Sequence, residues 1–141
     1  MIWINPALPL SEKIDTVVFD VDGVLIDITE SFSLAVVKTV QYILNHCFGW
    51  SSPPAITMDD IEAFRGAGGF NNDWDLSYAA LCLLLAQPDV PLAQAVKDSR
   101  GGGLAWAKSF LPPSVKLEYE MVRWVFDEFY WGEELFRHHF G

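Results

Sequence analysis

The chain has 141 residues, of which 51% are hydrophobic, and it carries a formal net charge of −10. This length and composition predict a globular chain, one domain by size, with a moderate core. The acidity excludes the basic stripe that nucleic-acid binding needs. No strongly apolar run approaches the roughly 20 residues of a membrane-spanning helix. We therefore expect neither a nucleic-acid partner nor a membrane partner.

The start of the chain and its two cysteines predict a cytoplasmic location. Residues 1–10 have neither a basic start nor a long apolar stretch, so we expect no signal peptide. Cys47 and Cys82 lack the spacing of metal ligands and fall within apolar helical patterns. This predicts buried thiols in a reducing compartment.

An apolar run followed by an acidic turn is the most informative stretch of the sequence. The β-branched and aromatic residues 16–19 predict a buried strand that ends in Asp20 and Asp22. Gly23 allows a sharp bend, so both carboxylates can face one small volume. Two such carboxylates repel and need a cation or a shared proton, and hard oxygen ligands suit Mg²⁺. The alternative is an ordinary turn, because Asp and Gly are common turn residues.

The run Asp20-Val21-Asp22-Gly23, with Asp27 four residues on, resembles the first motif of the haloacid dehalogenase superfamily, a hydrophobic strand followed by D-x-D-G-x-x-x-D. Most members of that superfamily are Mg²⁺-dependent phosphohydrolases. The resemblance implies that Asp20 is a nucleophile that forms an aspartyl-phosphate and that Asp22 is the general acid and base. It also implies that Mg²⁺ binds the Asp20 carboxylate and the main-chain carbonyl of Asp22, and that Asp27 has a mainly structural role.

Two helices are expected directly after the acidic turn. The first starts at Thr29 or Glu30, because apolar residues then recur at spacings of three and four. Thr57 and Asp60 form a capping-box pattern that starts a second, short helix. An acidic pair such as Asp59 and Asp60 also resembles a metal site, but no strand precedes it, which favours a helix cap.

A glycine-rich loop, residues 66–74, ends in two amides, a carboxylate and an indole. Such a loop lets the backbone approach a partner closely, and Asn71 or Asp73 can cap the next helix. A hinge and a cap, with Trp74 in the core, would account for the same residues. In haloacid dehalogenase proteins with a helical cap, a glycine-containing turn between cap helices faces the catalytic pocket and selects the substrate. The substrate-binding residues implied by this resemblance are Gly69, Asn71, Asn72, Asp73 and Trp74.

The remainder of the chain is predicted to be helical. Residues 75–86 are apolar nearly all round, which predicts a helix at the centre of a bundle. Ser114 is the expected cap of a long helix in which Arg123 and Asp127 pair on the solvated side. Residues 133–140 predict a last helix at the end of the sequence.

These elements predict a mainly α chain. A single strand cannot satisfy its own backbone hydrogen bonds, and the later motifs of the resembled family are absent from the sequence: a strand ending in Ser or Thr, a matched Lys and a second acidic pair. We therefore expect a helical cap bundle plus the first strand of a haloacid-dehalogenase-like α/β (Rossmann-type) core. Residues 1–28 form the predicted strand and catalytic turn, and residues 29–141 form the helical cap domain with a C-terminal helical tail.

Two hypotheses for function follow. The first is the N-terminal part of a Mg²⁺-dependent phosphohydrolase that acts on a small phosphorylated metabolite through an aspartyl-phosphate on Asp20. Each missing charge stabiliser commonly costs about 2.7–4 kcal/mol of barrier, so we expect this chain alone to be incomplete or inactive. The second is a non-catalytic helical interaction module or a remnant of such an enzyme. An unpaired strand edge further predicts self-association or a second polypeptide that completes the sheet.

Overall fold

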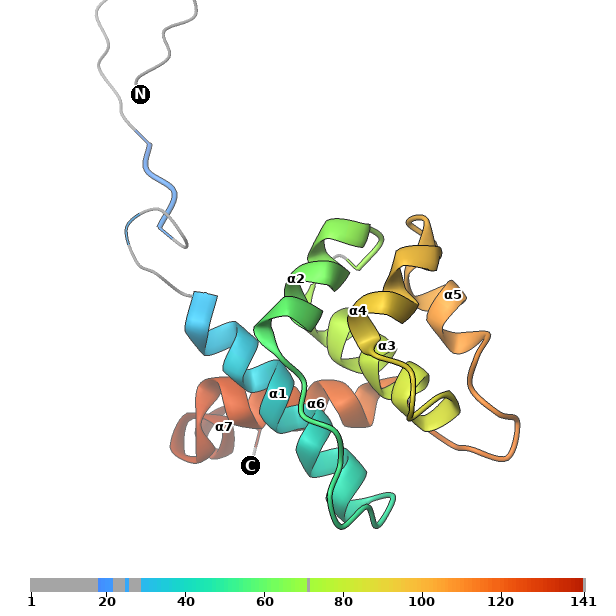
Figure 1. Ribbon diagram of the computed structural model, residues 1–141. Helices are drawn as coiled ribbons and strands as arrows, with labels where there is room; N and C mark the ends of the chain where they lie inside the picture. Colours follow the sequence, from blue (N-terminus) through green and yellow to red (C-terminus); the bar gives the residue numbers. More distant parts are fainter. Residues whose placement is uncertain (1–17, 22–24, 26–28, 71, 141) are drawn as a thin grey trace, which may run out of the picture.

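The computed structural model describes residues 18–21, 25, 29–70 and 72–140, and this described chain is mainly helical (Figure 1). The prediction of a mainly α chain is therefore confirmed. The described residues contain no helix that is long and apolar enough to cross a membrane. The elements are α1 (Thr29–His46), α2 (Met58–Ala67), α3 (Asp73–Ala86), α4 (Leu92–Ala95), the 3-10 helix η1 (Val96–Ser99), α5 (Gly103–Lys108), α6 (Tyr119–Trp131) and α7 (Glu133–Phe140).

Helix α3 forms the centre of the bundle, as its sequence predicts. It contacts α1, α4, α5 and α6, and every residue from Asp75 to Leu84 is buried. Asn72 caps its start, because its Oδ1 accepts a hydrogen bond from the Asp75 amide at 2.8 Å. This bond satisfies one of the amides that a helix start leaves without a partner. Apolar residues on all sides of α3 then let several helices pack around it.

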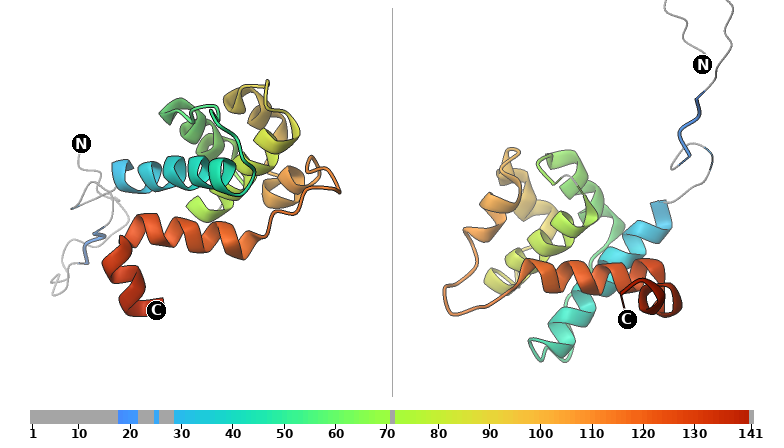
Figure 2. Two further views of the ribbon diagram at one scale, coloured as in Figure 1. Left: turned by 90° about the horizontal axis from the view of Figure 1, so that it is seen from below. Right: turned by 180° about the vertical axis from the view of Figure 1, so that it is seen from behind.

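Helices α1 and α6 contact both each other and α3, and Figure 2 shows the two side by side. The buried face of α1 carries four fully buried aliphatic residues at helical spacing, and α6 contributes Val122 and Phe126 to the same core. The four α1 residues are Val36, Val40, Ile43 and Leu44. Helix α7 contacts α6 and lies at the edge of the bundle.

The two cysteines differ in burial. The prediction of a buried thiol is confirmed for Cys82, but it is wrong for Cys47, which is exposed. Helix α1 ends at His46, and Cys47 belongs to the turn that follows. The helical period that would direct its side chain toward the core therefore no longer applies.

The capping box at the start of α2 is confirmed. The Asp60 amide donates to Thr57 Oγ1 at 3.2 Å, and the Thr57 amide donates to Asp60 Oδ2 at 2.9 Å. The other Asp60 oxygen, Oδ1, accepts from the Ala93 amide at 3.0 Å. This carboxylate is therefore used to fix a helix start and to hold α4 against it.

Helix α6 starts later than the sequence predicts. Ser114 does not cap it; the helix begins at Tyr119, with Glu118 at the cap position and no side-chain cap. Residues before it form a turn in which the Val115 amide donates to the Pro112 carbonyl at 2.9 Å. The Tyr78 hydroxyl then holds the Leu117 carbonyl at 2.9 Å. Both contacts belong to the non-helical segment that precedes α6.

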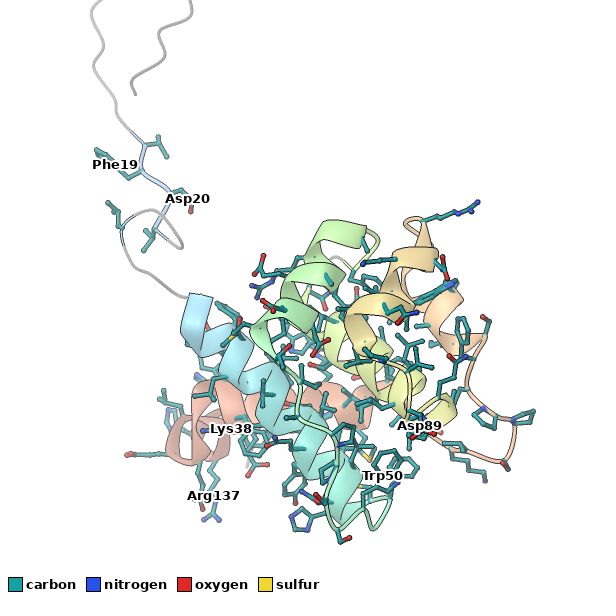
Figure 3. The ribbon with its side chains drawn as sticks, viewed as in Figure 1. Phe19, Asp20, Lys38, Trp50, Asp89 and Arg137 are labelled. Carbon is teal, nitrogen blue, oxygen red and sulfur yellow. The ribbon has the colours of Figure 1, made fainter. Side chains whose placement is uncertain are left out.

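The strand predicted for residues 16–19 is not seen. Residues 16 and 17 lie outside the described residues, and residues 18–21 have no regular secondary structure. Val18 is 88% exposed and Phe19 65% exposed, and Figure 3 shows Phe19 away from the helical body. A strand forms only where neighbouring strands accept its hydrogen bonds, and the described chain contains none. The proposed division between residues 28 and 29 stays a prediction.

Candidate functional site

The acidic turn is only partly described. Asp20 is exposed and lies on the segment that precedes the helical body (Figure 3), whereas Asp22 and Asp27 lie outside the described residues. The Asp20 carboxylate has the hard oxygen donors that Mg²⁺ prefers. Within the described ranges, no group of three or more His, Cys, Asp or Glu residues is arranged to hold a metal ion. The predicted Mg²⁺ site is therefore represented here by one carboxylate.

The glycine loop between α2 and α3 is pinned to a second glycine loop. A Cβ atom on Gly69 would collide with the Gly101 carbonyl oxygen, and one on Gly103 would collide with the Gly69 carbonyl oxygen. Both glycines also have positive φ angles, 82° and 54°, which favour residues without a side chain. Gly69 therefore serves a close backbone contact with the loop before α5. The neighbouring Asn71 lies outside the described residues.

Three of the five predicted substrate-binding residues line one pocket. This aromatic pocket has a volume of about 280 Å³ and lies where the start of α3 meets α1 and α6. Its walls are mostly apolar. The lining residues are Phe32 from α1, Asn72, Asp73 and Trp74 at the start of α3, and Phe126, Asp127, Tyr130 and Trp131 from α6.

The rings of the aromatic pocket contact one another. Phe32 and Tyr130 stack with centroids 4.4 Å apart, and Tyr130 lies 6.1 Å from Phe126 at an interplanar angle of 17°. Trp74 meets Phe126 edge to face at 6.2 Å. Such contacts between rings hold each wall in a defined orientation. The result is a preformed apolar surface rather than a set of independent side chains.

Two carboxylates lie among these rings. Asp127 is 8% exposed and accepts a hydrogen bond from Trp74 Nε1 at 2.8 Å. Its second oxygen, Oδ2, lies 3.8 Å from Arg123 Nε, which is too long for a hydrogen bond. The Arg123 guanidinium also lies over the Trp74 ring, 5.2 Å from its centroid. The predicted pairing of Arg123 with Asp127 is thus present, but the carboxylate is buried rather than solvated.

The other carboxylate, Asp73, belongs to a charged cluster beside the pocket. Arg65 NH2 lies 3.2 Å from Asp73 Oδ1, and Arg65 NH1 lies 3.1 Å from Glu62 Oε1. Arg65 also donates to Ser33 on α1 at 3.5 Å. A single arginine therefore links α2, α3 and α1 next to the pocket. Its charge is already shared between two carboxylates.

A partly buried hydrogen bond fixes the start of α6 beside the start of α3. The Tyr119 hydroxyl donates to Asp75 Oδ1 at 2.7 Å. Burial is the main cause that raises the pKa of Tyr119 to about 12, and the bond to Asp75 adds to it. Tyr119 therefore stays protonated and donating at neutral pH. This contact holds α6 in the position from which its later residues line the pocket.

Five of the eight residues that line the aromatic pocket were not predicted from the sequence as site residues. Asp127 was expected in a surface pair with Arg123, and Phe32, Phe126, Tyr130 and Trp131 were assigned to no site. One signal was present: residues 124–131 place a single Asp next to another carboxylate among five aromatic residues. Which face of α6 packs against α1 and α3 is decided by contacts between distant segments, and the sequence alone does not show them.

Comparison with known proteins establishes no family for the chain. No family model matches it, and no solved structure matches it. The chain is similar to the imidazoleglycerol-phosphate dehydratase of Phytophthora nicotianae, at 29% identity over 69 residues. The match covers 49% of this chain and 13% of the dehydratase, so the chain spans only a small part of that relative.

The assignment to the haloacid dehalogenase superfamily is therefore wrong. No model of that family matches, and the similarity found is to a protein named as a dehydratase. The described residues also form no strand that would belong to a Rossmann-type core. A motif of four acidic and glycine positions is too short to define a family without the surrounding sheet.

Proposed function

We propose that this chain is part of a magnesium-dependent phosphohydrolase that acts on a small phosphorylated metabolite. In this proposal Asp20 is the nucleophile, Asp22 is the general acid and base, and the helical body binds the organic part of the substrate. The remaining catalytic groups come from polypeptide beyond these 141 residues or from a second chain. The proposal rests on the residues of the acidic turn and on the aromatic pocket, and on no family assignment.

The observation that carries the proposal is the short tether between the acidic turn and the pocket. Helix α1 begins at Thr29, and Phe32 in its first turn is one of the pocket walls. The ten residues from Asp22 to Phe32 can span at most about 33–36 Å. A tether of this length allows the carboxylates to reach the end of the bundle at which the aromatic pocket lies, which is what the proposal requires.

The chemistry assigned to the two carboxylates is a double displacement at phosphorus. An Asp20 oxygen attacks phosphorus and forms an aspartyl-phosphate, while Asp22 donates a proton to the departing oxygen of the substrate. Asp22 then takes a proton from the water that attacks this intermediate, which releases inorganic phosphate and restores Asp20. Bound Mg²⁺ would reduce the repulsion between the phosphate and the carboxylates.

The comparison offers limited support for the substrate class. The name of the relative from Phytophthora nicotianae gives it a phosphorylated small molecule, imidazoleglycerol phosphate, as its substrate. A phosphorylated metabolite agrees with the chemistry of the acidic turn. Because the match covers 13% of that protein, we carry over only this broad class and not the dehydratase reaction.

The test is hydrolysis of 4-nitrophenyl phosphate by the purified chain, with Mg²⁺ or with EDTA. We expect slow, Mg²⁺-dependent release of nitrophenolate, since each missing charge stabiliser costs about 2.7–4 kcal/mol of barrier. Asp20→Asn should remove this activity. The matched control Asp98→Asn, at an exposed position on η1, should leave it unchanged. Equal rates in the wild type and Asp20→Asn would contradict the proposal, and no turnover in either protein would favour a fragment or a non-catalytic remnant.

A second candidate is a non-catalytic helical interaction module. It is favoured by one observation: the pocket walls all belong to the helical body, while Asp20 is exposed and apart from it. Such a module would bind its ligand equally well with and without Mg²⁺, and Asp20→Asn would have no effect on binding. It also predicts no reading frame downstream or nearby that supplies the missing Ser or Thr, Lys and acidic pair.

A further inference from the structure

The carboxylate of Asp127 is a polar group of the aromatic pocket with unused hydrogen-bonding capacity. The residue is 8% exposed, and its one hydrogen bond in the described chain comes from Trp74 Nε1. An ionised carboxylate can accept several hydrogen bonds. Oδ2 lies 3.8 Å from Arg123 Nε, too far for a hydrogen bond, and it is not among the polar atoms of the described chain that are fully buried without a partner. It can therefore accept a further donor.

The pocket has the size of a small ring system. Its volume of about 280 Å³ is nearly twice that of an apolar cavity of about 150 Å³ that accepts benzene. The walls are aromatic, and rings prefer to stack on or meet the edge of other rings. The volume of the pocket and its aromatic walls therefore both favour a ligand with a planar group of two fused rings.

The carboxylates of the aromatic pocket keep the phosphate group of a substrate out of it. Asp73 and Asp127 are the carboxylates that line the pocket, and both would repel an anion. The two arginines beside them are engaged, Arg65 by Asp73 and Glu62, and Arg123 by Asp127 and Glu120. A phosphorylated substrate would therefore insert its organic part and keep its phosphate outside.

We propose that the aromatic pocket binds a planar bicyclic aromatic group that carries an N–H donor, and that this N–H donates to the Asp127 carboxylate. The inference rests on the proposed function in one respect, because it identifies the pocket as the place of the substrate's organic part. Trp74 and the ligand then share the carboxylate, one at each oxygen. A nitrogen heterocycle can stack against the aromatic walls and donate a hydrogen bond to Asp127 Oδ2.

Two probes of nearly equal shape test this proposal. Indole has an N–H donor, whereas benzofuran has an ether oxygen in the same place and no donor. Both are titrated into ¹⁵N-labelled protein without phosphate or Mg²⁺, and the tryptophan side-chain N–H signals are followed. We expect both to shift the Trp74 signal, with indole binding at least fivefold more tightly.

The matched variant is Asp127→Asn. It keeps the size of the side chain and an oxygen for Trp74, but it replaces the second oxygen with an NH₂ group that cannot accept a hydrogen bond. The preference for indole should then fall to less than twofold, while benzofuran binding changes little. Asp98→Asn should keep the full preference. If Asp127→Asn fails to fold, as judged by circular dichroism, the comparison of the two probes on the wild type still decides.

Equal binding of indole and benzofuran to the wild type would overturn the assignment of an N–H donor, and binding of neither would overturn the pocket as a ligand site. The same titration on Asp20→Asn separates this inference from the proposed function. We expect its affinity for indole to equal that of the wild type, because the pocket does not include Asp20. If Asp20→Asn loses the hydrolysis seen in the wild type but keeps the preference for indole, both the proposed function and this inference are supported. If neither protein hydrolyses the phosphate ester and both prefer indole, only the binding inference is supported.

Discussion

Helix α3 and residues 18–21 are both rich in apolar residues, yet α3 is buried and residues 18–21 are exposed. Leu81 in α3 is fully buried and every residue from Asp75 to Leu84 is out of solvent. Val18 and Phe19 are 88% and 65% exposed. The difference lies in the backbone rather than in hydrophobicity. A helix satisfies its own amides and carbonyls, whereas a strand needs a neighbour before its apolar side chains can be buried.

This contrast explains why the core of the molecule is centred on α3. A helix that needs no hydrogen-bonding partner can be surrounded by other helices on several sides. An apolar segment with no sheet beside it stays in solvent despite the cost of its exposed surface. A segment of this chain is therefore buried only where its backbone amides and carbonyls find hydrogen-bond partners, which a helix provides within itself.

The largest effect is expected for a truncation in α3. Leu81→Ala should lower the free energy of unfolding by about 2–5 kcal/mol, because it removes buried methyl groups and leaves a cavity in a close-packed core. Urea denaturation followed by circular dichroism measures this change. The control Leu34→Ala makes the same chemical change at a position of α1 that is 49% exposed, and it should cost less than about 1 kcal/mol. Equal losses in the two variants would show that α3 is not the centre of the core.

A smaller effect is expected from pH, again through burial in α3. Burial raises the pKa of Cys82 from 9.0 to about 11, although a hydrogen bond with Tyr78 opposes the rise. The unfolded chain therefore loses this proton first as the pH increases. The contribution of the protonated Cys82 thiol to the free energy of unfolding is fully present below pH 9. It is lost as the pH rises to about 11, by about 2–3 kcal/mol in total.

Urea denaturation between pH 8 and pH 11 measures the Cys82 contribution. Cys82→Ala serves as the comparison, because it lacks the thiol and should show a shallower decline between pH 9 and pH 10. Above that range Tyr78 and Tyr119, whose pKa values burial raises to about 12, add to the decline in both proteins. Identical slopes below pH 10 would mean that Cys82 is not buried in the folded state.

Sequence analysis recovered the parts of the fold that local patterns determine. The capping box of Thr57 and Asp60 and the all-round apolar pattern of residues 75–86 depend on neighbouring residues alone, and both are confirmed. The start of α6 was predicted wrongly because a capping pattern at Ser114 does not reveal that the residues before Tyr119 stay non-helical, where Tyr78 from a distant helix binds the Leu117 carbonyl. The strand was predicted from composition without the partners that a strand requires.

The candidate site was predicted in the same uneven way. Asn72, Asp73 and Trp74 were named from a glycine loop, and they do line the aromatic pocket, although their part in substrate binding stays a prediction. Asp127 was not predicted as a site residue because its burial depends on the contact between α3 and α6. The bond from Trp74 to Asp127 joins residues that are 53 positions apart in the sequence. Pairings between distant segments leave no periodic signal in a single sequence.

The smallest effect is expected in the exposed apolar segment. Phe19→Ala should change the free energy of unfolding by less than about 0.5 kcal/mol, because substitutions of exposed side chains usually have small effects on stability, and Phe19 is 65% exposed. The same urea titration as for Leu81→Ala measures it, so the pair tests directly whether exposure or composition decides the contribution. A loss above 1 kcal/mol would show that Phe19 is covered in solution. If that loss grew with protein concentration, a second copy of the chain would be the cover, as self-association of an unpaired strand predicts.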